Sequence, residues 1–290
     1  SEKLRQRAAQ ASDRVHLFPF GVNLTTFERE SGAAIPDDLA ALPRPVAGYV
    51  GGLHQWVDQD LLAAVAARLP DVTFALVGPP QVDVSRLEAV PNIRLLGQRP
   101  HSDVPRYVKG FDVGLVPYRI AEYTENVYPT KLNEYLVMGT PVVATNLAEI
   151  RRFNAEHGDV VRIGATPDEY AAAIRGAMGG STPVEIARRI EVAESNSWER
   201  RLEAMRALID EALERKESSA QDWQGRLQRL YAGARRRTVQ VLAGLALAYG
   251  LVFHTPLAWW AAAPLKVEAA PRAADAIVVF AGGVGESGRA

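Results

Sequence analysis

The sequence has no cysteine among its 290 residues. This absence excludes a disulfide framework, a Cys-ligated zinc site, an iron–sulfur cluster and a thiol nucleophile, and it fits a reducing compartment. An excess of positive charge is also missing, because 33 Lys and Arg face 34 Asp and Glu and leave a formal net charge of −1. We therefore expect no binding of nucleic acid by the chain as a whole. The polar start at Ser1 predicts no signal peptide, and the missing initiator Met predicts that the natural start lies upstream.

Charge is absent from one long run near the end of the sequence. The run Thr238–Leu265 contains no Asp, Glu, Lys or Arg, and it exceeds the roughly 20 residues that a helix needs to cross a bilayer. Trp259 and Trp260 lie near one end of it, where aromatic residues mark a membrane interface. A buried core helix or hairpin is the alternative, because His254 and Pro256 interrupt the run. We predict a transmembrane segment over these residues, 238–265.

Basic residues give this segment an orientation. The arginines that precede it closely are Arg226, Arg229, Arg235, Arg236 and Arg237. Only Lys266 and Arg272 follow it closely. Because positive charge stays inside, we predict a location at the cytoplasmic membrane, with the residues before 238 in the cytoplasm and the C-terminal end on the outer side.

Apolar runs of strand length alternate with amphipathic stretches over the preceding residues. The predicted strands are 46–50, 72–77, 92–96, 113–116, 142–144 and 160–163, and the predicted helices are 59–68, 104–109, 131–138, 148–156 and 168–178. This alternation predicts an α/β fold with a Rossmann-like parallel sheet covered on both faces. A ligand crevice is expected at the carboxyl ends of the strands, where the strand order reverses. Beyond the sheet we predict helices over 182–217, interrupted at 195–197, and a linker at 216–224.

One predicted helix carries the richest set of binding groups. Pro129 suits a helix entry, and Thr130 is a candidate cap. Lys131 adds a full positive charge to the N–H groups of the helix N-terminus, which together suit a diphosphate. Glu134 lies one turn further on the same face and suits the diol of a ribose. A capped helix with an ordinary Lys–Glu pair accounts for the same residues, and the sequence alone leaves both interpretations open.

Two further patterns are less specific. Gly51 and Gly52 follow the first predicted strand, where glycines let the backbone approach a ligand, although a simple turn explains them equally well. Asp58 and Asp60 imitate a D-x-D metal motif, but they open a predicted helix, where Asp is favoured by the helix dipole. No metal site is therefore predicted.

The order of these features resembles the C-terminal, donor-binding half of a GT-B glycosyltransferase, close to family 4. The matching stretches are 13–23, 48–53, 74–80, 92–100, 112–118, 129–145 and 196–205, and PTKLNEYLVMGTPVVAT (129–145) is the most specific. The resemblance covers about residues 13–215. It implies a nucleotide-diphosphate sugar as donor substrate, with no other cofactor.

The resemblance also assigns roles to residues. It gives the diphosphate to Thr130 and Lys131, the ribose hydroxyls to Glu134 and the nucleobase to the stretch 97–99, with Lys131 as the catalytic residue. The full predicted donor-binding set is Gly51, Gly52, Gly97, Gln98, Arg99, Asn126, Tyr128, Pro129, Thr130, Lys131 and Glu134.

The sequence departs from the family pattern at two places. Asn126 stands eight residues before Glu134, where relatives often carry a sugar-contacting Glu. His54, Gln55 and Trp56 stand where many relatives place Arg and Lys in the first glycine loop. These departures leave the sugar and the binding of the diphosphate open. The PTK form of the motif (129–131) implies that Lys131 contributes more of the diphosphate binding.

In GT-B enzymes catalysis occurs between two halves, and this chain resembles only the half that follows the interdomain linker. We therefore expect residues 1–290 to bind the donor and, without the N-terminal acceptor-binding half, to transfer nothing. The predicted function of the whole protein is sugar transfer, with retention, to a glycan or lipid-linked acceptor of an envelope or extracellular polysaccharide. Two alternatives stay open: a GT-B nucleotide-sugar epimerase, and a non-catalytic, membrane-tethered nucleotide-binding module.

The end of the sequence predicts the start of another domain. A buried-strand pattern and a glycine-rich stretch follow the apolar run and resemble the opening of YdcF-like envelope proteins. The predicted organisation is an interdomain linker at 1–43, a nucleotide-sugar-binding domain at 44–180, crossing helices at 181–217, a basic linker at 218–237, the transmembrane segment at 238–265 and the truncated start of a second α/β domain at 266–290.

Overall fold

The computed structural model describes residues 1–27 and 33–265. The chain divides into two units, of which the first is Ser1–Glu211 and the second begins at Ala212. The predicted YdcF-like start at 266–290 lies outside the described residues.

A six-stranded sheet forms the centre of the first unit. Its strands are all parallel and follow the order β3-β2-β1-β4-β5-β6. The strands are β1 (Val46–Val50), β2 (Thr73–Val77), β3 (Ile93–Gly97), β4 (Val113–Val116), β5 (Val142–Thr145) and β6 (Val161–Gly164). Each predicted strand agrees with the observed one to within a residue at either end. The predicted α/β fold with a Rossmann-like parallel sheet is confirmed.

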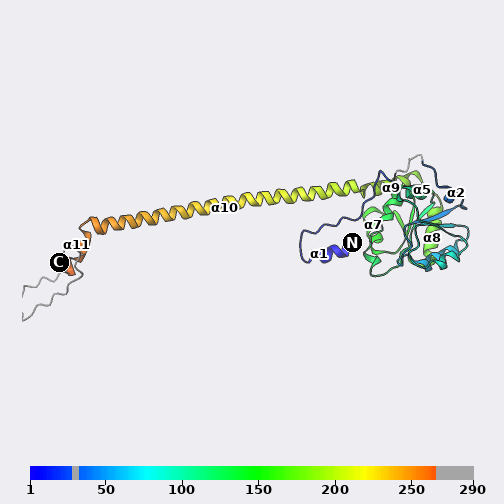
Figure 1. Cartoon of the computed structure of the whole chain (residues 1–290), viewed down its shortest axis with the longest axis horizontal. Helices are drawn as coiled ribbons and strands as arrows, with labels where there is room; N and C mark the ends of the chain where they lie inside the picture. Colours follow the sequence, from blue (N-terminus) through cyan, green and yellow to red (C-terminus); the bar gives the residue numbers. More distant parts are fainter. Residues whose placement is uncertain (28–32, 266–290) are drawn as a thin grey trace, which may run out of the picture. The chain divides into compact units, whose positions relative to one another are not determined.

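Helices connect these strands and extend beyond them (Figure 1). The α-helices of the first unit that begin and end within it are α1 (Glu2–Ala9), α2 (Asp37–Ala40), α3 (Gln59–Arg68), α4 (Ser85–Glu88), α5 (Val104–Lys109), α6 (Thr130–Val137), α7 (Ala148–His157), α8 (Pro167–Met178) and α9 (Pro183–Ser195). Two short 3₁₀ helices, η1 (His101–Asp103) and η2 (Thr124–Asn126), complete the connections.

The helices cover both faces of the sheet. The connection through α3 leads from β1 to β2, whereas the connection through α6 leads from β4 to β5 in the opposite direction across the sheet. Because such crossovers are right-handed, α3 and α6 lie on opposite faces. Helix α8 packs against α3, and α9 packs against α6. Every residue of β1, β2, β4 and β5 is consequently buried.

Two strand glycines let aromatic rings pack directly on the sheet. A Cβ atom at Gly48 would lie 2.2 Å from the ring of Phe111, and one at Gly114 would lie 2.5 Å from the ring of Tyr135. The Tyr135 hydroxyl accepts a hydrogen bond of 2.9 Å from the backbone N–H of Val50. This bond fixes helix α6 against the carboxyl end of β1.

One long helix, α10 (Trp198–His254), runs from the first unit into the second. The predicted interruption near residue 196 is confirmed, because α9 ends at Ser195 and α10 begins at Trp198. The linker expected at 216–224 is wrong, since these residues belong to α10. No Gly or Pro occurs between Trp198 and Gln224, and Glu, Lys, Ala and Gln favour a helix.

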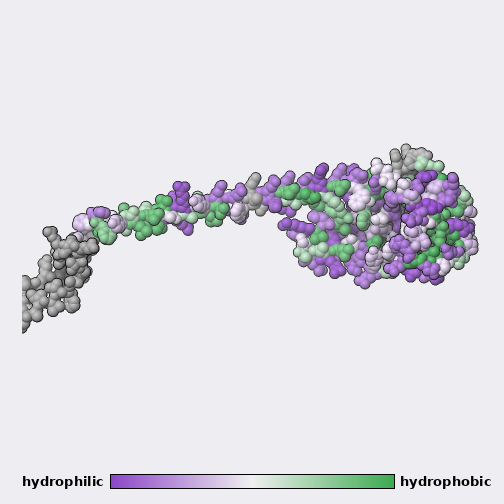
Figure 2. Space-filling model, viewed as in Figure 1, coloured by the Kyte–Doolittle hydropathy of each residue, from purple (hydrophilic) through white to green (hydrophobic). Residues whose placement is uncertain are grey.

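The uncharged segment 238–265 is not a single helix. Helix α10 ends at His254, and α11 (Leu257–Ala262) and η3 (Ala263–Leu265) follow. Pro256 lies at the break, because proline has no N–H to continue the helical hydrogen bonds. By length and composition alone, α10 contains a stretch apolar enough to cross a membrane. Large apolar side chains are exposed along this part of α10 (Figure 2), among them Val239, Val241, Leu242, Leu245 and Leu247.

Candidate functional site

A cavity of about 380 Å³ lies at the carboxyl ends of β1, β2 and β3. We call it the α6 cleft, because the first turn of α6 forms one of its walls. It is lined by Val50, Gly51, Gly52, Val77, Gly78, Pro79, Gln98, Arg99, His101, Val104, Thr130, Lys131 and Glu134. The strand order reverses between β1 and β4, so the cleft lies where a ligand crevice was expected.

Two glycine loops meet at the floor of this cleft. Gly51 follows β1 with φ of 138°, and Gly78 follows β2 with φ of 152°. A Cβ atom at Gly78 would lie 2.1 Å from the carbonyl oxygen of Gly51, and the Gly51 N–H donates to the carbonyl of Val77 at 2.8 Å. Only glycine allows both this conformation and this close approach.

Lys131 lies in the wall of the cleft, with 7% of its surface exposed. Its Nζ donates a hydrogen bond to the Tyr118 hydroxyl and lies 5.0 Å from the ring centroid of Tyr49 and 4.8 Å from that of Tyr118. A Cβ atom at Gly51 would lie 3.5 Å from the same Nζ. The ammonium is thus held by aromatic rings directly beneath the first glycine loop.

No ion pair joins Lys131 to Glu134 within the described part of the chain, so the plain Lys–Glu pair that the sequence allowed is not formed. Both side chains instead line the α6 cleft. Burial raises the pKa of the Glu134 carboxyl, against the opposing positive charges of Lys131 and His101. A buried ammonium without a paired carboxylate leaves the cleft able to attract an anion.

Thr130 does not cap helix α6, contrary to expectation. The N-cap residue is Pro129, no side chain forms a cap hydrogen bond, and Thr130 is the first helical residue, exposed at the cleft. Pro129 itself is buried and does not line the cleft. The first N–H groups of α6 therefore lack a side-chain cap, as at other helix starts that bind anions.

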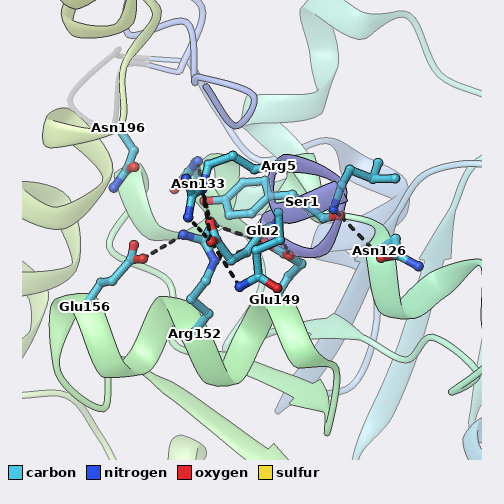
Figure 3. Close-up of polar contacts among 12 residues, drawn as sticks. Ser1, Glu2, Arg5, Asn126, Asn133, Glu149, Arg152, Glu156 and Asn196 are labelled. Atoms are coloured by element: carbon cyan, nitrogen blue, oxygen red, sulfur yellow. Dashed lines mark hydrogen bonds and ion pairs between the residues drawn. The ribbon is translucent and has the colours of Figure 1, made fainter. Parts of the chain in front are cut away.

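Asn126 does not line the cleft. Its Oδ1 accepts a hydrogen bond of 3.3 Å from the Ser1 hydroxyl (Figure 3), and its Nδ2 donates to the carbonyl of Glu122 at 2.8 Å. The residue ends the short helix η2. Its place in η2 directs the side chain toward α1 rather than into the α6 cleft.

Tyr128 also lies elsewhere, in a separate cavity of about 470 Å³ that Arg152 and Arg201 share. Its hydroxyl accepts a hydrogen bond of 2.9 Å from Nδ2 of Asn133. Burial raises its pKa well above the usual value for tyrosine. The extended backbone at Pro129 separates this side chain from those of the first helical turn.

Of the stretch 97–99, which was predicted to contact a nucleobase, only the last two residues line the cleft. Gly97 accepts a hydrogen bond of 2.8 Å from the N–H of Gly78 and supports the second glycine loop without lining the cleft. Gln98 and Arg99 do line it. Asp38 and the Tyr107 hydroxyl hold the guanidinium of Arg99, at 2.7 Å each.

Six cleft residues lie outside the predicted donor-binding set: Val50, Val77, Gly78, Pro79, His101 and Val104. Gly78 and Pro79 follow a buried strand just as Gly51 and Gly52 do, so the same strand-end pattern would have identified them. His101 carries no such signal, because it reaches the cleft only through the turn after Arg99.

The D-x-D pattern is a helix start, as predicted. The Asp58 side chain accepts a hydrogen bond of 3.0 Å from the N–H of Leu61 at the beginning of α3. Among residues 1–27 and 33–265, no group of His, Asp and Glu side chains is arranged to hold a metal ion.

The sheet unit is similar to known glycosyltransferases. Residues 44–179 match the family described as glycosyl transferases group 1. The chain is also 28% identical over 204 residues to the putative teichuronic acid biosynthesis glycosyltransferase TuaH of Bacillus subtilis, covering 68% of this chain and 51% of TuaH. These matches support a glycosyltransferase group 1 domain. The chain spans about half the length of this curated relative.

Solved structures show the same fold. Sucrose-phosphate synthase from Thermosynechococcus elongatus superposes with a TM-score of 0.55 at 21% identity, over 72% of this chain and 56% of that one. Anabaena HepE in complex with UDP and glucose superposes with a TM-score of 0.53 at 19% identity, over 74% and 61%. Together with the parallel sheet, these neighbours show a Rossmann-like domain of GT-B type.

Proposed function

We propose that the α6 cleft binds the nucleotide diphosphate of a sugar donor. The observation that carries this proposal is the convergence of Gly51, from the loop after β1, with Lys131 and Glu134 of α6 on one cavity at the reversal of strand order. The group 1 match over residues 44–179 adds support, as does a structural neighbour solved with UDP and glucose.

Each group has a role in this proposal. The ammonium of Lys131 and the uncapped N–H groups of α6 bind the diphosphate. The Glu134 carboxylate accepts hydrogen bonds from the ribose hydroxyls, and Gln98 and Arg99 form the wall beside the nucleobase. When the bond from the anomeric carbon to the diphosphate oxygen breaks, its electron pair remains on the diphosphate. Lys131 and the helix N-terminus then stabilise the developing negative charge.

We propose that the whole protein transfers the sugar, with retention, to a glycan or lipid-linked acceptor of a cell-envelope or extracellular polysaccharide. TuaH supports this assignment through its description as a teichuronic acid biosynthesis glycosyltransferase. The chain spans about half of TuaH, so we propose that residues 1–290 bind the donor without transferring its sugar. No cofactor besides the donor is proposed.

Calorimetric titration with UDP, GDP and ADP tests the nucleotide site directly. Lys131→Ala is expected to weaken binding of the preferred nucleotide by about 1.5–3 kcal/mol, the net value of a hydrogen bond to a charged group. Lys131→Arg keeps the charge and should recover part of that loss. Lys216→Ala, on the exposed surface of α10, is the matched control and should bind as the original chain does. Equal affinities of the Lys131→Ala and original proteins would disprove the diphosphate role.

Transfer is tested separately with a radiolabelled nucleotide sugar and a membrane extract as acceptor. The full-length gene product is expected to label the extract, and NMR of the product reports the anomeric configuration. Incorporation by residues 1–290 alone would contradict the proposal that this part only binds. Release of a free epimerised sugar would instead favour the epimerase.

We also propose that the uncharged part of α10, with the residues that follow it, crosses the cytoplasmic membrane. The exposed apolar side chains after Thr238 and the arginines Arg235–Arg237 before them support this topology. A reporter fused after Ala290 is expected to be active on the outer side, and a reporter fused after Arg229 in the cytoplasm. Cytoplasmic activity of both fusions would contradict a single crossing.

A further inference from the structure

Three aromatic rings extend outward from the α6 cleft. The ring of His54 stacks on that of Trp56, with centroids 4.0 Å apart and planes 23° apart. Trp56 in turn lies 5.8 Å from Tyr123, at 35°. A cavity of about 590 Å³ lies against these last two rings, lined also by Gln55 and Arg119. We call this cavity the aromatic subsite.

Backbone hydrogen bonds hold the two loops that carry the rings. The carbonyl of Trp56 accepts a hydrogen bond of 2.8 Å from the N–H of Arg119. Thr124, which is buried, accepts a hydrogen bond of 2.9 Å from the N–H of Ala121 and donates to that residue's carbonyl at 3.1 Å. These contacts fix the turn that presents Tyr123. The rings are therefore positioned before any ligand arrives, which reduces the entropic cost of binding.

The loop after β1 contributes to both the α6 cleft and the aromatic subsite, through Gly51 and Gly52 in the first and Gln55 and Trp56 in the second. Gly52 lines the cleft, and a Cβ atom at Gly52 would lie 2.9 Å from Nε2 of His54. His54 thus lies next to a cleft residue, and its ring stacks on Trp56, which lines the aromatic subsite. A ligand on these rings would lie beside whatever the cleft binds.

The chemistry of the subsite combines flat apolar faces with polar groups at the edge. Tyr123 is 66% exposed, and Gln55 presents an exposed amide. The Arg119 guanidinium forms an exposed ion pair with Asp60, with 3.6 Å between Nη2 and Oδ2, and it also lines the subsite. A pyranose ring has a matching character, because its C–H face packs on an aromatic ring while its hydroxyls bind donors at the edge.

We propose that the aromatic subsite binds a pyranose ring of the glycan substrate, stacked on Trp56 and Tyr123 and bonded through its hydroxyls to Gln55 and Arg119. This inference rests on the proposed function, because it places the sugar next to the donor cleft. The ring belongs either to the acceptor glycan or to the donor's own sugar, and these two sources give different results below.

Binding is measured with an array of neutral, N-acetylated and uronic acid-containing oligosaccharides, followed by saturation-transfer NMR on those retained. The chain is held in lipid nanodiscs, because maltoside detergents would compete for the site. Tyr123→Ala is expected to weaken oligosaccharide binding by about 5- to 10-fold and Trp56→Ala by at least about 10-fold, through loss of stacking. Tyr123→Phe keeps the ring face and should stay within about 2-fold. Ile120→Ala, an exposed neighbour outside the lining, is the matched control.

Two arms separate the sources of the sugar. If the subsite holds the acceptor, free oligosaccharide binds and Tyr123→Ala weakens it. If the subsite holds the donor's sugar, Tyr123→Ala instead removes the difference in affinity between UDP-glucose and UDP. Unchanged binding in both arms, with folded Tyr123→Ala protein by circular dichroism, would overturn the proposal.

The nucleotide titrations distinguish a failure of the subsite proposal from a failure of the proposed nucleotide site. Oligosaccharide binding that depends on Tyr123, without binding of UDP, GDP or ADP, supports the subsite and contradicts the nucleotide site. Nucleotide binding that depends on Lys131 supports the nucleotide site. If the ring variants then change neither oligosaccharide binding nor the difference in affinity between UDP-glucose and UDP, the subsite is contradicted while the nucleotide site stands.

Discussion

Large apolar side chains are buried in the sheet but exposed on the C-terminal part of α10. In β4 and β5 every residue is buried beneath helices, whereas Leu242, Leu245 and Leu247 of α10 are each at least 60% exposed. A soluble core explains the first arrangement, because burial of apolar surface stabilises the fold. The second arrangement lacks that compensation within the described residues, and a lipid environment would provide it.

A matched pair of truncations tests this contrast most strongly. Leu115→Ala, at a fully buried position of β4, is expected to lower the free energy of unfolding by about 2–5 kcal/mol through loss of burial and creation of a cavity. Leu245→Ala on α10 should change it by less than about 0.5 kcal/mol, because the side chain is 63% exposed. Urea denaturation followed by tryptophan fluorescence measures both. Similar losses would show that α10 contributes to the same core.

Charge placed in the exposed apolar part of α10 should affect the membrane rather than the fold. Leu245→Lys is expected to cost about 3 kcal/mol for insertion at mid-bilayer and to reduce the fraction of protein that stays with membranes after a carbonate wash. Leu230→Lys, on the same helix before the uncharged run, is the matched control. Equal retention of the two variants would count against the crossing.

The sheet could be predicted because each of its strands is a short apolar run that is recognisable in the local sequence. The predictions at Val46–Val50 and Val113–Val116 coincide with the observed strands. Apolar runs of this length between turn residues are typical of buried strands and are too short for buried helices. The extent of helix α10 was harder to predict from the sequence. The Ser and polar residues around 218 suggested a linker, but without Gly or Pro the helix continues through them. Pro256 interrupts the uncharged run in the sequence, and in the structure α10 ends just before it, at His254.

In the site, the positions after the strands (Gly51, Gly52, Gln98 and Arg99) and the spacing within helix α6 predicted cleft residues correctly. Lys131 and Glu134 face the same cavity because they are three residues apart on one helix. Asn126 and Tyr128 precede that helix, where η2 and Pro129 decide the direction of each side chain, and no periodicity predicts it. The approach of Tyr123 to Trp56 depends in the same way on two loops that only the folded sheet brings together.

Removing a buried hydroxyl from the sheet unit should lower the free energy of unfolding, whereas removing an exposed hydroxyl from α10 should not. We expect this difference to be smaller than that between the two leucine truncations. The N–H of Val50 has the Tyr135 hydroxyl as its partner, so Tyr135→Phe leaves a buried donor unsatisfied. This change is expected to cost about 1–3 kcal/mol of unfolding free energy. Tyr231→Phe, on the exposed surface of α10, should be neutral. Urea denaturation of both variants checks the difference, and a neutral Tyr135→Phe would mean that water replaces the hydroxyl.

Protonation of Glu134 should give the smallest contrast, visible only as a function of pH. Burial raises the pKa of its carboxyl in the folded protein above the ordinary glutamate value of 4.5, so the folded state binds a proton more readily than the unfolded state. Its contribution to stability is therefore fully present below the ordinary value and is lost as the pH rises through the raised one. Relative to Glu134→Gln, the original protein should gain unfolding free energy on acidification through this window. Glu217→Gln, at an exposed position of α10, is the matched control for the loss of one carboxylate. Parallel profiles for the Glu134→Gln and original proteins would show that the cleft leaves this carboxylate as well solvated as one on the exposed helix.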